Sequence, residues 1–107
     1  MKPLVALKLL RFVYEVPAKQ IADYLGMSEH NYHKIERGEI NLSLAHALKL
    51  SDLFAVSIDI MAKGGRTAVF KVLSELSEEQ FDANLKRIRA LLMQDAPSTA
   101  RLYKDLN

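Results

Sequence analysis

Four side chains that can exchange hydrogen bonds with a ligand lie close together in the sequence, at Glu29, His30, His33 and Lys34. A carboxylate, two imidazoles and an ammonium group can contact nucleic-acid bases, hold a metal ion or transfer protons. The spacing of His30 and His33 suits a metal on one helix face, but no carboxylate or thiolate pattern completes a metal site. Which chemistry applies therefore depends on the elements that position these four residues.

Residues 18–38 predict two short helices joined by a tight turn. Apolar residues recur at helical spacing from Ile21 to Leu25, and Gly26 then supplies the positive φ angle that a sharp break needs. Ser28 is a suitable N-cap for the second helix, since its hydroxyl can accept hydrogen bonds from the free amides of the first turn. This order of elements is the sequence outline of a helix-turn-helix DNA reader.

The second helix is predicted to bury one face and expose the other. Tyr32 and Ile35 form the apolar face, with the Tyr32 hydroxyl expected at the rim of the core. The four polar side chains then face a major groove, where Lys34 or a histidine can donate to guanine and Glu29 can accept from cytosine. An ordinary amphipathic helix would present the same residues to solvent, so it is the surrounding motif that favours base contact.

Short motifs follow one another along residues 4–63: Leu10-Arg11, Ile21-Ala22, Leu25-Gly26, Ile35-Glu36-Arg37-Gly38, Ala47-Leu48 and Leu53-Phe54-Ala55-Val56-Ser57. In this order and at these separations they resemble the phage-repressor and Cro type of helix-turn-helix, also called the xenobiotic-response-element family. The resemblance implies a compact five-helix domain that binds operator DNA as a dimer through its third helix. It also implies a partly buried ion pair between Arg11 and Glu36, which braces the first helix against the end of the reading helix.

The chain departs from the family pattern at the start of the first of the two helices. The family usually has a phosphate-clamping Gln at the position of Ala18 and a Ser or Thr N-cap at the position of Pro17. Only backbone amides remain to contact phosphate at Ala18. The further residues expected to contact phosphates are Lys19, Arg37, Asn41 and Ser43. Glu39 lies among them and has the same sign of charge as DNA.

Helical periodicity continues along the rest of the chain, without repeats or strand-like alternation. The expected helices cover about 3–14, 17–25, 28–36, 43–54, 57–63, 67–75 and 78–94, with a short last one after Ser98. The pair Gly64-Gly65 is the only domain joint that the sequence suggests. We therefore expect an all-α protein, with a five-helix repressor-type helix-turn-helix domain over 1–63 and an extension of two or three helices over 66–107 that serves dimerisation or partner binding.

The extension carries an apolar stripe with 4-3-4 spacing, formed by Phe81, Leu85, Ile88 and Leu92. Two heptads are too short for a stable free coiled coil, so this stripe should bury against the first helix of the same chain or against another subunit. The first helix has an apolar outer face to match, formed by Val5, Leu9, Phe12 and Val13. A homodimer is the expected outcome, because two-fold symmetry suits operator half-sites about 34 Å apart.

Length and composition limit the other classes of function. A chain of 107 residues provides about one domain, and the absence of Cys excludes a disulfide framework and fits a reducing cytoplasm. The net charge of +2 permits nucleic-acid binding without requiring it. No glycine-rich phosphate loop or nucleophile elbow indicates an enzyme, and no run of 18 apolar residues indicates a membrane span. We expect a cytoplasmic protein that is not an enzyme and needs no metal or cofactor.

Three functions remain open. The first is a sequence-specific transcription regulator, most simply a repressor, that reads a palindromic operator in double-stranded DNA as a dimer through residues 28–36. The second is an antitoxin-like or anti-regulator protein whose C-terminal helices bind a protein partner. The third is a protein-interaction module that has lost DNA binding, as Ala18, Glu29 and Glu39 suggest. Whether the apolar stripe of the extension is exposed or covered separates the first two functions. Salt-dependent DNA binding separates both of them from the third.

Overall fold

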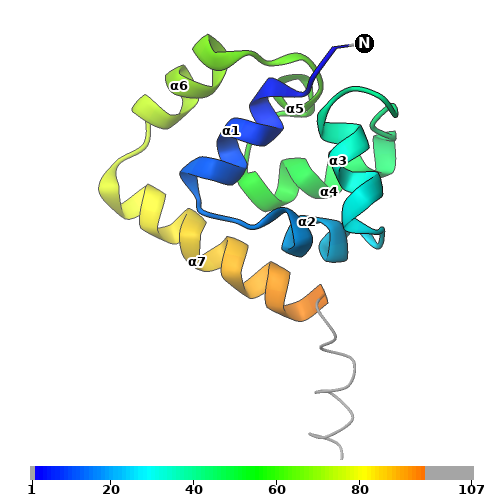
Figure 1. The fold of residues 1–107 in the computed structure, drawn as a ribbon. Coiled ribbons are helices and arrows are strands. Elements are labelled where there is room, and N and C mark those ends of the chain that lie inside the picture. The colour runs from blue at the N-terminus through cyan, green and yellow to red at the C-terminus, as the bar shows by residue number, and fades with distance from the viewer. Residues whose placement is uncertain (1, 96–107) are drawn as a thin grey trace, which may run out of the picture.

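The computed structural model describes residues 2–95, and this part of the chain forms helices and no strands (Figure 1). The helices in chain order are α1 (Val5–Val13), α2 (Ala18–Leu25), α3 (Glu29–Glu36), α4 (Leu44–Phe54), α5 (Ile58–Lys63), α6 (Arg66–Ser74) and α7 (Glu78–Asp95). The expected all-α class is therefore confirmed, and each helix lies within a few residues of its predicted bounds. The short helix predicted after Ser98 lies outside the described residues.

Serine caps determine where several of these helices begin. The hydroxyl accepts a hydrogen bond of 3.1 Å from the amide three residues further on at Ser28, Ser43, Ser57 and Ser77. At Ser77 the bond is reciprocal, because the side chain of Gln80 accepts from the Ser77 amide at 2.8 Å. Such caps satisfy amides that have no partner within the helix, which explains why the helix starts follow from local sequence.

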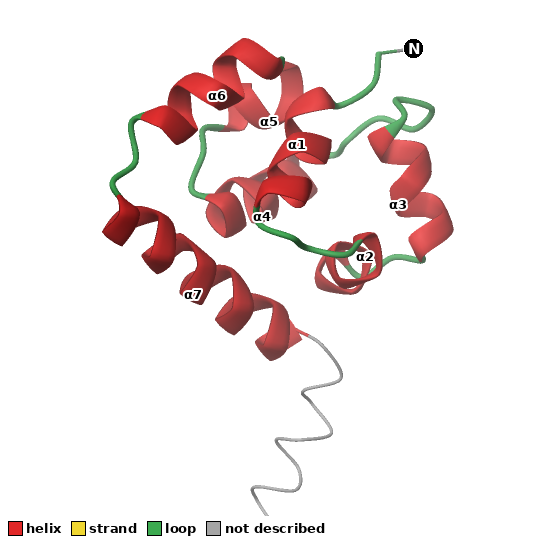
Figure 2. Ribbon diagram, turned by 60° about the vertical axis from the view of Figure 1, so that its left-hand side comes forward, coloured by secondary structure: helices red, strands yellow, loops and turns green. Residues whose placement is uncertain are grey.

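The first helix is at the centre of the domain. It packs on α3, α5 and α6, while α2 packs on α3 and α4 packs on α5. In two views α3 and α6 lie on opposite sides of the molecule, with α1 between them (Figure 1, Figure 2). The largest fully buried side chains come from all seven helices: Leu7, Leu10, Ile21, Tyr32, Leu50, Leu53, Phe54, Met61, Val69 and Ile88. One core thus supports both the predicted reading helix and the C-terminal extension.

The apolar stripe of α7 packs on its own chain. Ile88 and Leu92 are buried, and Phe81 and Leu85 are half-buried against the same core. The elements with the most extensive contacts to α7 are α2 and α4. We expected this stripe to bury against the first helix or another subunit, and its main partners are instead α2 and α4. The other helix of the extension, α6, does pack on α1, and Tyr14, after the end of α1, stacks on Phe81 with ring centroids 4.9 Å apart.

Polar contacts also hold α7 in place. The Arg87 guanidinium donates to the carbonyl oxygen of Leu53 from Nε and Nη2, at 3.3 and 3.1 Å. Its Nη1 donates to Asn84 Oδ1 at 2.7 Å, and the Asn84 amide donates to the Tyr14 hydroxyl at 3.0 Å. Leu53 lies in the last turn of α4, where carbonyls lack a partner within the helix. The side chain of Arg87 therefore caps α4 and fixes the register of α7.

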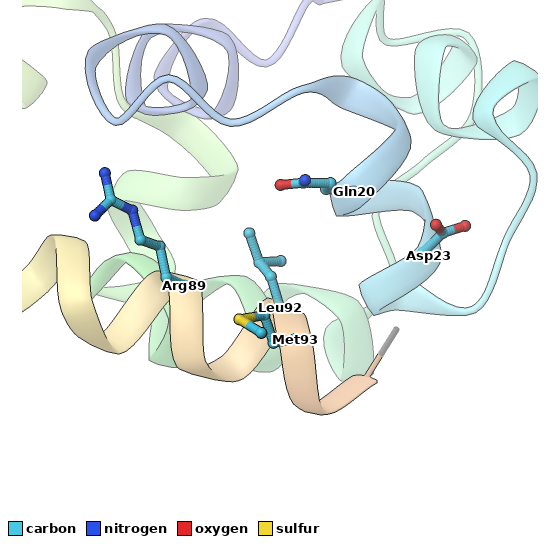
Figure 3. A pocket seen from close by; sticks show the side chains of 5 residues that line it. All are labelled: Gln20, Asp23, Arg89, Leu92 and Met93. Atoms are coloured by element: carbon cyan, nitrogen blue, oxygen red, sulfur yellow. The ribbon is translucent and has the colours of Figure 1, made fainter. Parts of the chain in front are cut away.

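Beyond this network, α7 and α2 do not close completely on each other. A pocket of about 290 Å³ is lined by Gln20, Asp23, Arg89, Leu92 and Met93 (Figure 3). Leu92 points from α7 toward α2, while Arg89 and Asp23 lie at opposite ends of the pocket. Asp23 pairs instead with Lys19 on its own helix, at 3.8 Å. The α2–α7 contact is thus apolar at its centre and is not bridged by charge.

Two glycines delimit α3, and they differ in their surroundings. Gly26 has φ +76° and a Cβ atom placed there would meet nothing within 4 Å. Gly38 has φ +83°, and a Cβ atom there would lie 2.4 Å from the carbonyl oxygen of Lys2. Both positions favour glycine because of φ, but only Gly38 also needs the space. The N-terminal segment is therefore packed directly on the end of α3.

We predict that the two glycines differ in their tolerance of alanine. Gly26→Ala should lower the free energy of unfolding by about 1–2 kcal/mol, the usual cost of a left-handed backbone at a residue with Cβ. Gly38→Ala should lower it further, because the Lys2 backbone must also move. Urea denaturation of both variants measures the difference, and equal losses would contradict a close contact between Lys2 and Gly38.

Candidate nucleic-acid interface

The turn between α2 and α3 is closed by backbone hydrogen bonds. The amide of Gly26 donates to the Asp23 carbonyl at 3.1 Å, and the amide of Met27 donates to the Ala22 carbonyl at 3.0 Å. Ser28 then caps α3. Because Ala22 is buried and small, the two helices can approach closely at this corner. The orientation of α3 relative to α2 is thus set within a few residues.

The outward face of α3 is polar. Tyr32, Ile35 and Glu36 are buried, so the opposite side of this eight-residue helix faces solvent. The four predicted base-contacting residues, Glu29, His30, His33 and Lys34, are exposed or half-exposed on that side. The structure therefore brings these four side chains to one surface, as a helix that enters a major groove requires.

Asn31 is exposed on the same helix, and the sequence analysis missed it. Its side-chain amide offers both a donor and an acceptor, the pair of groups that matches adenine N6 and N7. Its position in the first turn of α3, where the Ser28 hydroxyl accepts from its backbone amide, leaves the side chain free of any capping role. A signal was present, since Asn is a weak helix former and its place inside a short helix needs a reason other than helix propensity.

Glu29 does not stand alone on this face. Its Oε2 lies 3.4 Å from Nε2 of His33, one helical turn further on. When His33 is protonated, this contact is an ion pair across positions i and i+4. The carboxylate that would otherwise repel DNA phosphates thus has a partner that can offset its charge.

The two cations predicted to contact phosphates are each next to a carboxylate. Lys19 pairs with Asp23 at 3.8 Å, and the Arg37 Nε donates to Glu39 Oε2. The hydrogen bond with Glu39 raises the pKa of Arg37, and the same bond lowers the pKa of Glu39. All four side chains are well exposed, so both pairs are readily exchanged for other partners.

The remaining phosphate candidates are Ala18 and the two polar residues Asn41 and Ser43. Ala18 is buried, and Pro17 in the N-cap position of α2 makes no side-chain cap, so only amides are offered there. Asn41 and Ser43 are exposed in the connection between α3 and α4. The Ser43 hydroxyl accepts from the amide of His46 and can still donate its own hydrogen.

The end of α3 is held to α1 by a buried ion pair. Arg11 Nε donates to Glu36 Oε2 at 3.0 Å, and Arg11 Nη2 donates to Oε1 at 3.1 Å. The Tyr32 hydroxyl donates to the same Glu36 Oε2 at 2.6 Å. The expectation of a Tyr32 hydroxyl at the rim is therefore wrong. Tyr32 has no exposed surface, because the carboxylate supplies an acceptor inside the core.

Protonation of this network is determined by its own contacts. Burial by itself would raise the pKa of Glu36, but hydrogen bonds from Arg11 and Tyr32 outweigh burial and lower it. Burial raises the pKa of Tyr32, and its hydrogen bond to Glu36 raises it further. The hydrogen bond to Glu36 also raises the pKa of Arg11. Near neutral pH the network holds one cation, one anion and a neutral phenol.

These features define a helix-turn-helix domain of the DNA-binding class: two packed helices, a turn with positive φ and an outward polar face on the second helix. A family model described as Helix-turn-helix matches residues 17–61, from the residue before α2 into α5. This match confirms the resemblance to the xenobiotic-response-element family and assigns the segment to a DNA-binding, transcription-regulator type of domain. No curated protein and no solved structure matches the chain. No described helix is long and apolar enough to cross a membrane.

We predict that loss of the Arg11 side chain destabilises the protein strongly. Arg11→Ala leaves the Glu36 carboxylate buried without its cation, so the free energy of unfolding should fall by about 3 kcal/mol. Tyr32→Phe removes one hydrogen bond and should cost about 1 kcal/mol. Urea denaturation at neutral pH measures both variants, and an Arg11→Ala protein as stable as the wild type would argue against the role of the pair.

The wild type and the Arg11→Ala variant should also differ in how their free energy of unfolding changes in acid. Because the folded state lowers the pKa of Glu36, its contribution to stability is present above the ordinary carboxyl pKa of 4.5 and is lost as the pH falls through the folded value. Arg11→Ala removes the main cause of the lowered pKa. Its stability should therefore decline less than that of the wild type between neutral pH and pH values below 4.5.

Proposed function

We propose that the protein is a transcription regulator that binds a palindromic operator as a dimer and reads bases with the exposed face of α3. The observation that supports this most is that α3 exposes a polar face while its opposite face is buried in the core. Glu36 ties its end to α1, and Ser28 caps its start. A reading helix that is held at both ends can discriminate between bases, because a wrong base leaves its polar groups without partners.

Each side chain on this face suits a particular base edge. Lys34 donates to O6 and N7 of guanine, and either histidine can do the same with fewer donors. Asn31 suits adenine, and Glu29 suits the N4 amino group of cytosine. Phosphate contacts from Arg37, from the Asn41–Ser43 connection and from the amides at Ala18 would set the register on the duplex. Repression is the simplest consequence, since a bound dimer excludes other proteins from the operator.

Dimerisation needs a surface that the chain itself does not cover. Of the residues predicted to form an interface, Ile88 and Leu92 are buried in the core of their own chain and Leu9 is half-buried. Val5 and Phe12 on α1 remain 37% and 59% exposed. We propose that a second subunit packs on this exposed part of α1, with half-sites separated by one or more helical turns of DNA.

A second candidate is an antitoxin-like or anti-regulator protein, in which the same apolar residues bind a different protein. Phe70 on α6 is 53% exposed, and α6 packs beside α1 on the side away from α3. Large apolar side chains left exposed on neighbouring helices are typical of protein-interaction sites. This surface is separate from the reading face, so DNA binding and partner binding are compatible in one molecule.

Our first prediction from this proposal concerns base reading. Purified protein should enrich a palindromic motif from random genomic fragments, and a His33→Ala, Lys34→Ala double variant should bind that motif at least about tenfold more weakly. Lys71→Ala on α6 provides a control with the same loss of charge away from α3. A motif bound equally well by the double variant would contradict reading by α3, and no salt-dependent binding by the wild type would favour a protein-interaction module without DNA binding.

A second prediction concerns the carboxylate beside Arg37. Glu39→Gln removes the partner that holds the guanidinium, so affinity should rise for all DNA sequences alike and the salt dependence should steepen by about one counterion per protomer. Glu75→Gln, an exposed carboxylate at the end of α6, controls for the change in net charge. Fluorescence anisotropy with a labelled duplex between about 50 and 200 mM salt measures both quantities. Equal effects of the two variants would show that Arg37 does not contact phosphate.

A further inference from the structure

The N-terminal segment is fixed against the end of the reading helix by its main chain. The Leu4 amide donates to the carbonyl oxygen of Glu36 at 2.9 Å, which satisfies a carbonyl in the last turn of α3. Two residues earlier, the Lys2 backbone lies so close to Gly38 that a Cβ atom there would be 2.4 Å from its carbonyl oxygen. In both overall views the segment runs beside the loop that follows α3 (Figure 1, Figure 2).

This packing places the main chain of the exposed Lys2 against Gly38, the residue that follows Arg37. A depression of about 390 Å³ beside Pro3 is lined by Lys8, Arg37 and Glu39. It lies at the end of α3, because Glu36 also lines it. A helix that lies in a major groove has phosphate backbones on either side, so a cation beside its end lies near one of them.

Lys2 also differs in its surroundings from Lys19 and Arg37, the two cations predicted to contact phosphates. Arg37 is held by Glu39, and Lys19 lies within ion-pair distance of Asp23. Among the described residues, Lys2 makes no ion pair. A phosphate can therefore be contacted by Lys2 without first displacing a carboxylate.

We infer that Lys2 is a further DNA-binding residue, which donates from its ammonium group to a backbone phosphate beside the C-terminal end of α3. The inference rests on the proposed function and adds to it a contact outside the helix-turn-helix segment. Such a contact carries no base information, so it strengthens binding to every sequence alike and fixes how the reading helix enters the groove. Gly38 is the residue that makes this possible, because any side chain there would displace the Lys2 backbone.

The test measures the salt dependence of binding for four proteins to a fluorescein-labelled mixed-sequence duplex of about 20 base pairs, between about 50 and 200 mM salt. Lys2→Gln should flatten the slope of log K against log salt by about 0.9 per bound protomer, while Lys2→Arg should retain the wild-type slope. Lys71→Gln, on α6 opposite the reading helix, should leave the slope unchanged. Because the Lys2 atoms closest to a Cβ at Gly38 belong to the main chain and Lys2 is exposed, the thermal midpoint of unfolding should stay the same in every variant.

The possible results distinguish a failure of the Lys2 contact from a failure of the proposed DNA-binding function. Salt-dependent binding by the wild type with an unchanged slope in Lys2→Gln would overturn the role of Lys2 and leave the DNA-binding function standing. Equal flattening in Lys2→Gln and Lys71→Gln would also overturn it, because the effect would then come from net charge alone. No salt-dependent binding by the wild type would overturn the proposed function itself. A flatter slope in Lys2→Gln alone, with the wild-type slope retained in Lys2→Arg and in Lys71→Gln, supports the contact.

Discussion

The two hydrogen bonds between Arg11 and Glu36 determine where the polar face of α3 lies. They join α1, which is at the centre of the core, to the last residue of the reading helix. The Tyr32 hydroxyl, also on α3, donates a further hydrogen bond to the Glu36 carboxylate. The backbone carbonyl of Glu36 accepts a hydrogen bond from the Leu4 amide of the N-terminal segment. A buried charge pair adds little net stability compared with apolar packing, but it tolerates only one relative placement of its partners. Its value here is therefore geometric, since it fixes the end of α3 against α1.

Much of this architecture follows from local sequence. Serines mark the starts of α3, α4, α5 and α7, and the glycines at 26 and 38 mark the ends of α2 and α3, because caps and left-handed turns depend on a few neighbouring residues. The outward face of α3 was predictable for the same reason, since its apolar residues recur with the helical period. These are features in which local preference and tertiary structure agree.

Other features depend on residues distant in sequence and were not predictable from patterns. The stripe on α7 showed that a partner must exist, but apolar periodicity does not distinguish the surface of α2 and α4 from that of α1. The resemblance implied the pair of Arg11 and Glu36, but not that the Glu36 carboxylate also accepts a hydrogen bond from a buried Tyr32 hydroxyl. Ala55 adopts φ +55° where a glycine would be expected, and its neighbours hold the turn by a bond from the Val56 amide to the Ser51 carbonyl. Sequence patterns thus predicted the helices of the site and their exposed faces, while contacts between residues distant in sequence determine which helices pack together.

The cap that Arg87 places on Leu53 has a consequence for the order in which the protein is made. On the ribosome α1 to α5 emerge first, with the last turn of α4 and the ring of Tyr14 still lacking the contacts that α7 provides. A nascent chain that ends before Arg87 contains all of α3, but the part of α2 and α4 that α7 covers is not yet fully packed. The core that α2 and α4 share with α7 is therefore complete only after α7 has been synthesised.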